Sequence, residues 1–393
     1  MSQFSPAQHP DFSAADQHFM QQALQLAENA GRETSPNPRV GCVLVREQRV
    51  IGRGWTQAVG QAHGEVQALR DAAAQGETVA GATAYVTLEP CAHYGRTPPC
   101  ALALVKAGVA RVVVAMLDPN PLVAGKGVAI LREAGIVVSA GLFADQAREQ
   151  NLGFYKRMEQ GLPWLRLKIA ASLDGKTALN NGQSQWITGA AARADGHAWR
   201  AQADAILTGS GTVLADDPLL NVRDLASTNP AQKIIQPQRW VLDSRLRTPA
   251  TSRLLQSAKS PEQGAVVLVH ALSEGSISEA QQALQYQAEL LALPAASAAT
   301  TQVDLCACLQ AMAARQINTV HAEAGAELNG ALLQAGLVDE IVLYLAPTLL
   351  GPGRAMLNLP ELSALQDASH WHFVDQQIIG QDLRLLLRRA KSQ

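Results

Sequence analysis

The chain has 393 residues, of which 47 % are hydrophobic and 17 % are charged, and its formal net charge is −2. At roughly 100–200 residues per domain, this length predicts two or three domains. The ordinary balance of apolar and charged residues excludes wholesale disorder. Because neither half of the chain has an excess of basic residues, we expect neither duplex nucleic acid nor an anionic membrane surface as its main partner.

Three further features bear on where the protein works. No apolar stretch reaches the roughly 18–20 residues that a membrane span requires. The first residues are polar and lack the basic start and apolar core of a signal peptide. The five cysteines are an odd number, which does not suggest a disulfide framework. We therefore expect a cytoplasmic protein.

In the first half, apolar spacing and glycine breaks alternate between helical and extended patterns. Helices are predicted at residues 16–31, 63–75, 98–107 and 128–134. Strands are predicted at residues 40–45, 49–52, 82–88, 111–116 and 136–139. The successive valines at 112–114 are typical of a strand buried in a parallel sheet. This alternation predicts an α/β domain over residues 1–158.

A second α/β pattern follows a predicted linker at residues 153–163, which is charged and contains Gly161 and Pro163 as breakers. Strands are predicted at 164–170, 205–208, 239–242, 265–269, 319–322 and 340–346, and helices at 190–202 and 331–335. Residues 225–238 and 293–301 are predicted surface loops. The second domain is therefore expected over residues 159–393.

One histidine and two cysteines form the first candidate site. His63 opens a predicted helix, Cys91 follows a strand, and Cys100 opens the next helix. Three such ligands leave the fourth tetrahedral position of a zinc ion open for water. Glu65, in the first turn of the same helix as His63, can take a proton from that water and pass it to a leaving amine. The pattern His-x-Glu, then Pro-Cys and Cys, is typical of zinc nucleobase deaminases.

The spacing of the two cysteines leaves other interpretations open at this point. In the generic pattern they lie three positions apart, whereas Cys91 and Cys100 are separated by a longer segment. His93 could be a fourth ligand of a purely structural zinc, in a protein that is not an enzyme. A deaminase acting on RNA bases shares the zinc chemistry, but it would need a basic groove. Thiolate ligands favour zinc over iron.

Longer motifs around these residues narrow the choice. They are Pro36-Asn37-Pro38-Arg39-Val40-Gly41, His63-Gly64-Glu65, TLEP at 87–90, CAHYGRTPPC at 91–100, and Asp118-Pro119-Asn120-Pro121. Together they resemble the bifunctional deaminase/reductases of riboflavin biosynthesis. The run at 91–100 is specific to that family and accounts for the long cysteine spacing. The resemblance implies an N-terminal cytidine-deaminase-like α/β/α domain.

For this first domain, the resemblance implies zinc-dependent deamination of 2,5-diamino-6-(5-phosphoribosylamino)pyrimidin-4-one. His63, Cys91 and Cys100 would hold one Zn²⁺, and Glu65 would shuttle the proton. Further contacts implied with the substrate are Asn37, Asp118 and Asn120 to the pyrimidine or ribose, and Arg96 to the phosphate.

Other features of the first domain qualify this reading. Asn37, Asp118 and Asn120 flank prolines and could instead serve turns. Two departures from the family are Gly64, in place of its usual alanine, and Thr56, in place of its usual histidine.

In the second half, several predicted strands end in small residues just before helices. Free amides at such helix starts attract phosphates, but no Gly-x-Gly-x-x-Gly follows a strand, and Gly209-Ser210-Gly211 equally suits a plain turn. The segments at 167–176, 184–187, 209–220, 241–244 and 321–325 resemble the reductase half of the same family. The resemblance implies a C-terminal dihydrofolate-reductase-like α/β domain that uses NADPH to reduce the ribosyl group to a ribityl chain.

The implied residues of the reductase fall into two groups. Cofactor contacts would be Ala170, Trp186, Thr212, Asp216, Ser244 and Gly325. Substrate contacts would be Ser184, Arg200, Leu220, Arg223 and Glu323, with Lys168 and Asp174 as further candidates near the reacting sugar. From the residues alone, Trp186 could belong to the core and Arg200 could be an exposed helix charge. Ala324 stands where the family has glycine, and its methyl group could crowd a phosphate.

The sequence thus predicts a bifunctional enzyme whose partner is a small phosphoribosylaminopyrimidine, with neither nucleic acid nor membrane. The alternative is a deaminase whose C-terminal half is only a binding or oligomerisation module. We expect a homo-oligomer, of a size that the sequence does not give. The acid that assists opening of the sugar ring is not identified by the sequence.

Overall fold

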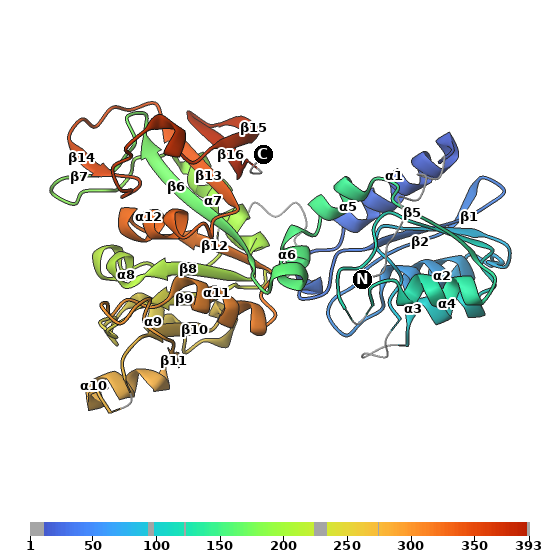
Figure 1. The fold of residues 1–393 in the computed structure, drawn as a ribbon, viewed down its shortest axis with the longest axis horizontal. Coiled ribbons are helices and arrows are strands. Elements are labelled where there is room, and N and C mark those ends of the chain that lie inside the picture. Colours follow the sequence, from blue (N-terminus) through green and yellow to red (C-terminus); the bar gives the residue numbers. More distant parts are fainter. Residues whose placement is uncertain (1–11, 93–97, 122, 224–233, 274, 391–393) are drawn as a thin grey trace. The chain divides into compact units, whose positions relative to one another are not determined.

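The computed structural model describes residues 12–92, 98–121, 123–223, 234–273 and 275–390. The chain divides into two compact units, Met1–Gly161 and Leu162–Gln393 (Figure 1). Within the described ranges, no helix combines the length and apolar character needed to cross a membrane.

The described strands of the first unit form a five-stranded sheet in the order β2-β1-β3-β4-β5. These strands are β1 (Gly41–Arg46), β2 (Arg49–Trp55), β3 (Thr83–Val86), β4 (Arg111–Val114) and β5 (Val137–Ala140). β1 pairs antiparallel with β2 and β3, whereas β3, β4 and β5 are parallel. The carboxyl ends of β3 and β4 therefore lie at the same edge.

Helices cover both faces of this sheet. They are α1 (Ala14–Glu28), α2 (Gly64–Ala74), α3 (Cys100–Lys106), α4 (Lys126–Glu133), α5 (Ala144–Glu149) and α6 (Leu152–Gln160), with a 3-10 turn at Arg32–Thr34. Along β1, Cys42 and Leu44 pack in one cluster with α2, α3 and α4, while Val43 and Val45 pack in another with α1 and α5. Figure 1 shows the two helical layers on either side of the sheet. The alternation of side chains along the strands thus produces an α/β/α arrangement.

The predicted helices and strands of this unit are present, with ends that differ by a few residues. The predicted linker at 153–163 is wrong, because most of it forms α6. Phe154 and Tyr155 are buried in the core of the unit, so the segment is anchored rather than extended. Gly161 ends this helix in the left-handed region at φ 68°. The predicted domain boundary after residue 158 therefore falls inside the last turn of α6.

A buried carboxylate joins α1 to the sheet. Asp16 accepts hydrogen bonds from Tyr85 Oη at 2.8 Å and from Arg111 Nη1 at 2.6 Å, and it completes a capping box with Ser13. Burial alone would raise the pKa of Asp16, but hydrogen bonds from Arg111, Tyr85 and Ser13 lower it to about 2. The carboxylate therefore stabilises the folded state above its unfolded pKa near 4.

Asp16→Asn is expected to lower the free energy of unfolding by about 2 kcal/mol at neutral pH. Because the folded pKa of Asp16 is depressed, this difference should shrink as the pH falls from about 4 through about 2. Urea unfolding at several pH values, followed by circular dichroism, measures it. A difference between variant and parent that does not change with pH would contradict this role.

The second unit contains a nine-stranded sheet among its described residues, in the order β11-β10-β9-β8-β12-β6-β13-β16-β15. Its strands are β6 (Trp164–Ser172), β8 (Ala205–Gly209), β9 (Gln238–Leu242), β10 (Val266–His270), β11 (Glu289–Ala292), β12 (Thr319–Glu323), β13 (Glu340–Ala346), β15 (Trp371–Ile379) and β16 (Asp382–Arg389). The strands from β11 to β13 are parallel, and β16 and β15 add to the sheet antiparallel. β7 (Lys176–Leu179) and β14 (Gly353–Ala355) form a separate ribbon.

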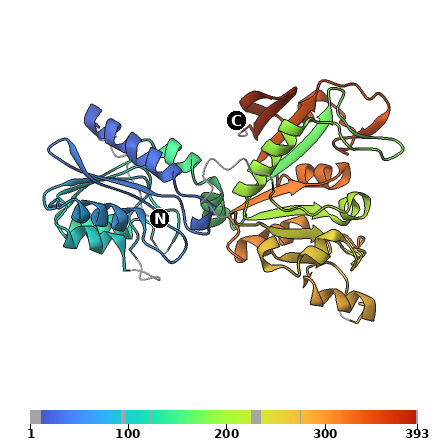
Figure 2. The same cartoon turned by 180° about the vertical axis from the view of Figure 1, so that it is seen from behind.

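Helices also cover both faces of this sheet. They are α7 (Ala190–Gln202), α8 (Ser210–Asp216), α9 (Arg253–Ser257), α10 (Glu279–Gln282), α11 (Leu305–Ala314) and α12 (Ala326–Gln334), with 3-10 turns at Pro261–Gln263, Ala283–Tyr286 and Leu365–Asp367. α11 and α12 pack on one face, and α8 and α9 on the other. α7 lies on the same face as α8, over β12, β13 and β16 (Figure 2).

The predicted strands of the second unit are all present, and the predicted helix at 331–335 is the end of the longer α12. α11 went unpredicted because its residues are apolar almost throughout, so no amphipathic period marks it. β15 and β16 were missed as well; β15 is exposed along nearly all its length, so it lacks the alternating pattern of a half-buried strand. The predicted loop at 293–301 is confirmed, whereas most of that at 225–238 lies outside the described residues.

Candidate active sites

The structure brings the three predicted metal ligands together in the first unit. His63 Nδ1 lies 3.6 Å from Cys91 Sγ and 3.3 Å from Cys100 Sγ. The three donor atoms all lie within 4.8 Å of one another. Donors arranged tetrahedrally around zinc, at bond lengths of about 2.0–2.3 Å, lie about 3.5 Å apart. The donor set and its spacing therefore fit a zinc ion.

The beginnings of two helices and the end of one strand position these ligands. His63 is the N-cap of α2, Cys100 is the first residue of α3, and Cys91 follows β3. The backbone amide of Cys100 also donates to Cys91 Sγ at 3.3 Å. A Cβ atom at Gly54 would lie 2.3 Å from two backbone atoms of α2. Glycine at this position of β2 therefore lets the helix that bears His63 approach the sheet closely.

Glu65 lies beside the cluster and is only 3 % exposed. Burial raises the pKa of its carboxyl to about 7, and the nearby Cys91 sulfur adds to the rise. A hydrogen bond with the Cys100 thiol acts in the opposite direction. A carboxyl whose pKa lies near neutral pH can both accept and release a proton.

The pKa values of the two thiols are shifted in opposite directions. Hydrogen bonding from Cys100 lowers the pKa of Cys91 to about 4, and the same interaction raises the pKa of Cys100. The hydrogen bond with Cys91 raises the pKa of His63. The lowered pKa of Cys91 favours its thiolate, which is the form of cysteine that binds metals.

A buried carboxylate that the sequence analysis left without a role supports this site. Glu89 is 3 % exposed and accepts hydrogen bonds from the backbone amides of Asp118, Gly125 and Val128, at 3.2, 2.9 and 3.1 Å. It thereby ties the segment before Cys91 to the loop after β4 and to the start of α4. The sign of a role for Glu89 in the sequence was its position in the TLEP motif at 87–90.

Gly127 lies in the first turn of α4, where it packs against the residue before Cys91. A Cβ atom at this position would lie 1.9 Å from the carbonyl oxygen of Pro90. No side chain fits there, so α4 or the Pro90–Cys91 peptide would have to move.

Gly127→Ala is expected to lower the free energy of unfolding by about 1–3 kcal/mol and to weaken metal binding. Gly196→Ala is the matched control, because Gly196 also lies in a helix but a Cβ atom there meets nothing within 4 Å. That control should be neutral or stabilising by up to about 1 kcal/mol. Thermal unfolding and zinc titration measure both variants, and equal behaviour would contradict the close approach.

The remaining predicted substrate residues of this unit lie in loops. Asp118 is 8 % exposed, and burial raises its pKa to about 6. Its carboxylate accepts the backbone N–H of Asn120 at 2.8 Å, which is the turn role expected beside proline. Asn37 follows the 3-10 turn and donates its backbone N–H to Thr34. Arg96 and His93 lie outside the described residues.

Thr56 is buried and bonds to the backbone at the start of β1. Its hydroxyl accepts the Val40 N–H at 3.1 Å, and its own N–H donates to the Val40 carbonyl oxygen at 2.9 Å. In this chain, position 56 therefore fixes the β1 segment. Gly64 is also close to that segment, since a Cβ atom would lie 2.8 Å from the same carbonyl oxygen.

In the second unit, the predicted cofactor residues gather at one edge of the sheet. Strand pairing aligns Lys168 with Glu323 and Gly209 with Leu242, so β6, β12, β8 and β9 end at about the same level. The predicted cofactor residues at these carboxyl ends are Ala170 in β6, Thr212 in α8 after β8, Ser244 after β9 and Gly325 after β12. Open α/β sheets bind ligands at this edge, where the strand order reverses.

The predicted cofactor residues differ in exposure and in their existing contacts. Gly325 is the N-cap of α12, and a Cβ atom there would meet nothing within 4 Å. Ser244 Oγ accepts the N–H of Val303 at 3.1 Å. Trp186 is 67 % exposed, with the Arg193 guanidinium 4.3 Å above its ring, so it does not belong to the core. Asp216 is exposed at the end of α8, and partial burial raises its pKa.

Arg200 and Glu323 form a partly buried ion pair beneath this edge. Arg200 Nη2 donates to Glu323 Oε2 at 2.8 Å, its Nε donates to the other carboxylate oxygen, and both side chains are 15 % exposed. Arg200 is therefore not an exposed helix charge. Lys168 lies alongside on β6, and burial lowers the pKa of its ammonium group.

The remaining predicted residues of the second unit lie in its core, in loops or on its surface. Leu220 is 3 % exposed and packs in the core, so only its backbone can face a ligand. Arg223 is exposed and donates to Asn221 Oδ1 at 3.0 Å. Ser184 is half-buried in the loop before α7. Asp174 accepts the amides of Leu350 and Gly351 and so holds the loop after β13.

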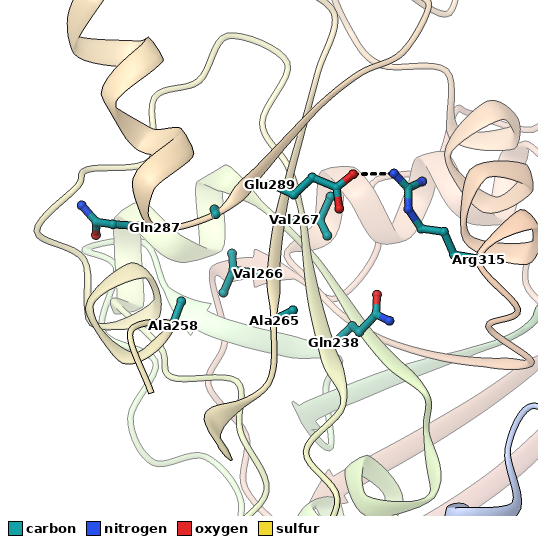
Figure 3. Close-up of a pocket in the computed structure, with 9 residues that line it drawn as sticks. Gln238, Ala258, Ala265, Val266, Val267, Gln287, Glu289 and Arg315 are labelled. Carbon is teal, nitrogen blue, oxygen red and sulfur yellow. Dashed lines mark hydrogen bonds and ion pairs between the residues drawn. The ribbon is translucent and has the colours of Figure 1, made fainter. Parts of the chain in front are cut away.

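A hollow of about 410 Å³ lies at the opposite edge of the same sheet. It is lined by Gln238, Ala258, Ala265, Val266, Val267, Gln287, Ala288, Glu289 and Arg315, which lie at and around the amino ends of β9, β10 and β11 (Figure 3). Arg315 and Glu289 form an ion pair across it. None of the predicted site residues lines this hollow.

Comparison with known proteins identifies the family of the chain. Residues 13–116 match the family model of the cytidine and deoxycytidylate deaminase zinc-binding region. Residues 163–380 match the model of the RibD C-terminal domain. The riboflavin biosynthesis protein RibD of Escherichia coli (strain K12) is 45 % identical over 379 residues, which are 95 % of this chain and 99 % of that protein. The chain belongs to the RibD family.

Other RibD proteins extend this similarity to solved structures. RibD of Haemophilus influenzae is 44 % identical, over 95 % of this chain and 98 % of that protein. Acinetobacter baumannii RibD, form 1, is 46 % identical with a TM-score of 0.85, over 96 % of this chain and 99 % of the other. The deaminase/reductase of Thermotoga maritima is 28 % identical with a TM-score of 0.81, over the same shares.

RibD membership confirms the predicted fold class, with a cytidine-deaminase zinc-binding domain followed by a RibD reductase domain of the dihydrofolate-reductase type. It also confirms a bifunctional deaminase and reductase of riboflavin biosynthesis. The alternative of a C-terminal half that only binds or oligomerises is thereby set aside, as are a non-enzymatic zinc protein and an RNA-base deaminase.

Proposed function

We propose that the first unit deaminates 2,5-diamino-6-(5-phosphoribosylamino)pyrimidin-4-one at the ring carbon that bears the 2-amino group. The cluster of His63, Cys91 and Cys100 is the observation that carries this proposal. These residues would hold one Zn²⁺, which when bound makes water a better nucleophile near neutral pH. Substrate specificity would come from Asn37, Asp118, Asn120 and Arg96.

Glu65 has the central role among the protein's own groups. Its buried carboxylate would take the proton from the attacking water and deliver it to the leaving amine. The raised pKa of Glu65 supports this role, because the same group must first accept the proton and then release it. Asp118, whose pKa is also raised by burial, is suited to hydrogen bonding with the substrate.

For the second unit, we propose reduction of the ribosyl group to the ribityl chain, giving 5-amino-6-(5-phosphoribitylamino)uracil. NADPH, when bound, supplies the hydride for C1′ of the sugar. The open space at Gly325, at the start of α12, suits a cofactor phosphate. Cofactor contacts are proposed for Ala170, Trp186, Thr212, Asp216, Ser244 and Gly325.

Substrate contacts in the second unit are proposed for Ser184, Arg200, Leu220, Arg223, Glu323 and Lys168. Arg200 and Glu323 would hold the sugar end of the substrate from beneath, with Lys168 alongside. A buried ammonium whose pKa is lowered releases its proton more readily, which suits Lys168 to the opening of the sugar ring.

The test is NADPH oxidation, followed by absorbance, together with ammonia release. The diaminopyrimidine substrate should give both signals, and the deaminated intermediate should give NADPH oxidation alone. Ammonia release without NADPH oxidation on either substrate would overturn the proposed reductase. NADPH oxidation on the intermediate without ammonia release from the first substrate would overturn the proposed deaminase.

We also propose a homo-oligomer that works in the cytoplasm on this small molecule, with neither nucleic acid nor membrane as partner. The near-neutral net charge supports the absence of a polyanionic partner. None of the five cysteines, all of them in the described ranges, forms a disulfide, which suits a reducing compartment. Light scattering of the purified chain gives the oligomeric state.

A further inference from the structure

His321 is a completely buried histidine without a role in the chemistry described above. It lies in the middle of β12 with 0 % of its surface exposed. Neither Nδ1 nor Nε2 of its ring makes a well-formed hydrogen bond to any described residue. A buried polar group without a partner costs about 1–3 kcal/mol. Its retention in the centre of a sheet therefore calls for an explanation.

Charged residues of the proposed reductase site lie near His321, on its own strand β12 and on the neighbouring strand β6. His321 Nε2 lies 3.4 Å from Glu323 Oε1, and the two residues, two positions apart, share one face of the sheet. Across the pairing with β6, His321 lies opposite Arg166, and Glu323 lies opposite Lys168. Arg200 reaches the same carboxylate from α7.

A second ion pair includes Arg166, the residue opposite His321 on β6. Arg166 Nε donates to Glu340 Oε1 at 2.5 Å, and Arg388 Nε donates to Glu340 Oε2 at 3.0 Å. Arg166 Nη1 is buried and has no hydrogen-bond partner among the described residues. His321 therefore neighbours one member of each ion pair, Glu323 on its own strand and Arg166 opposite it on β6.

We propose that His321 is a positioning residue for Glu323. In its neutral form, with the proton on Nε2, the imidazole offers a donor toward the Glu323 carboxylate and keeps an acceptor at Nδ1. It thus holds the carboxylate in place when the guanidinium of Arg200 is shared with the substrate. This inference rests on the proposed function of Glu323 as a substrate contact.

The surroundings keep the imidazole neutral. Burial lowers its pKa, and the positive charges of Arg166 and Arg200 lower it further, against the opposing effect of Glu323. Lys168 faces Glu323 from β6 and adds a third positive group nearby. A neutral imidazole can be donor and acceptor at once, whereas a protonated one is a donor on both sides.

The test compares His321→Leu with His321→Gln in the complete chain. Leucine removes both polar atoms, whereas the glutamine amide keeps a donor and an acceptor. With the deaminated intermediate as substrate, His321→Leu should lower the reductase kcat by about tenfold or more, because misplacing a reacting group is costly. The KM for NADPH should stay unchanged, and His321→Gln should restore most of kcat.

Two controls separate this role from a structural one. His270→Leu removes another buried strand histidine of the same unit and should leave the reductase kcat unchanged. Ammonia release by the first unit reports on the integrity of each variant and should be unaffected. A reductase kcat for His321→Leu equal to that of the parent would overturn the proposal, as would equal losses in the leucine and glutamine variants.

A nitrogen NMR spectrum of ¹⁵N-histidine-labelled protein tests the tautomer directly, with His321→Gln assigning the signal. The expected spectrum at neutral pH shows a neutral ring protonated at Nε2. A doubly protonated ring, or a neutral ring protonated at Nδ1, would overturn the proposal. Absence of any reductase activity in the parent would instead count against the proposed function, and the NMR result would then still decide the state of His321.

Discussion

Glu65→Gln is expected to lower the rate of ammonia release by about 100- to 10,000-fold, the range that general acid–base catalysis contributes. The amide keeps the size of the carboxyl and its place beside Cys100, but it can neither accept nor deliver the proton. Because Glu65 is buried and its pKa is raised to about 7, the glutamine also replaces a group that is readily neutral, so the fold should tolerate it. Steady-state ammonia release measures the effect.

The second unit supplies the control for this variant. Glu65→Gln should oxidise NADPH at the parental rate when it is given the deaminated intermediate. It should also bind one zinc ion per chain, because glutamine leaves His63, Cys91 and Cys100 in place. Ammonia release within about tenfold of the parent would contradict the proton-shuttle role.

Cys100→Ala is expected to reduce bound zinc to well below one ion per chain and to bring ammonia release down to background. Cys100 supplies one of the three protein ligands, and its sulfur lies 3.3 Å from His63 Nδ1. With two protein ligands left, the site no longer has the set of three that catalytic zinc sites use. Elemental analysis of the purified protein, together with the ammonia assay, measures the change.

Cys308→Ala is the matched control, since Cys308 is 1 % exposed and Cys100 is fully buried. Both variants lose one buried thiol, but Cys308 lies in α11 of the second unit. Its zinc content and ammonia release should equal those of the parent. A full zinc complement in Cys100→Ala would show that the ion lies elsewhere.

The zinc cluster could be predicted from the sequence because each ligand stands at the beginning or end of a local element. His63 at a helix start, Cys91 after a strand and Cys100 at the next helix start are each visible in the local pattern, and the motif supplies their combination. The role of Glu89 could not be predicted, because the amides that it binds come from residues about 30–40 positions further along.

Local sequence patterns could not predict that the charged residues of the second unit lie together. The reason is the order of the strands in the sheet. β12 is inserted between β6 and β8, although it follows both in the chain. Only this insertion places Glu323 opposite Lys168 and brings His321 beside Arg166. The sequence singled out Glu323, Arg200 and Lys168 through the family motif, but it could not show that they lie together.

The linker was predicted wrongly because glycine and proline were taken as signs of an extended connection. In the structure they mark the end of a helix, and the aromatic pair of Phe154 and Tyr155 that precedes them packs into the first core. Aromatic residues at adjacent positions give no helical period by themselves, so the breakers dominated the interpretation.

The two units share no member of any hydrophobic cluster among the described residues. Each cluster takes all its members from one unit, and the division falls between Gly161 and Leu162, outside every helix and strand. The codons for each hydrophobic core therefore lie on one side of this junction. Recombination there would transfer every residue of a core together, without dividing either set.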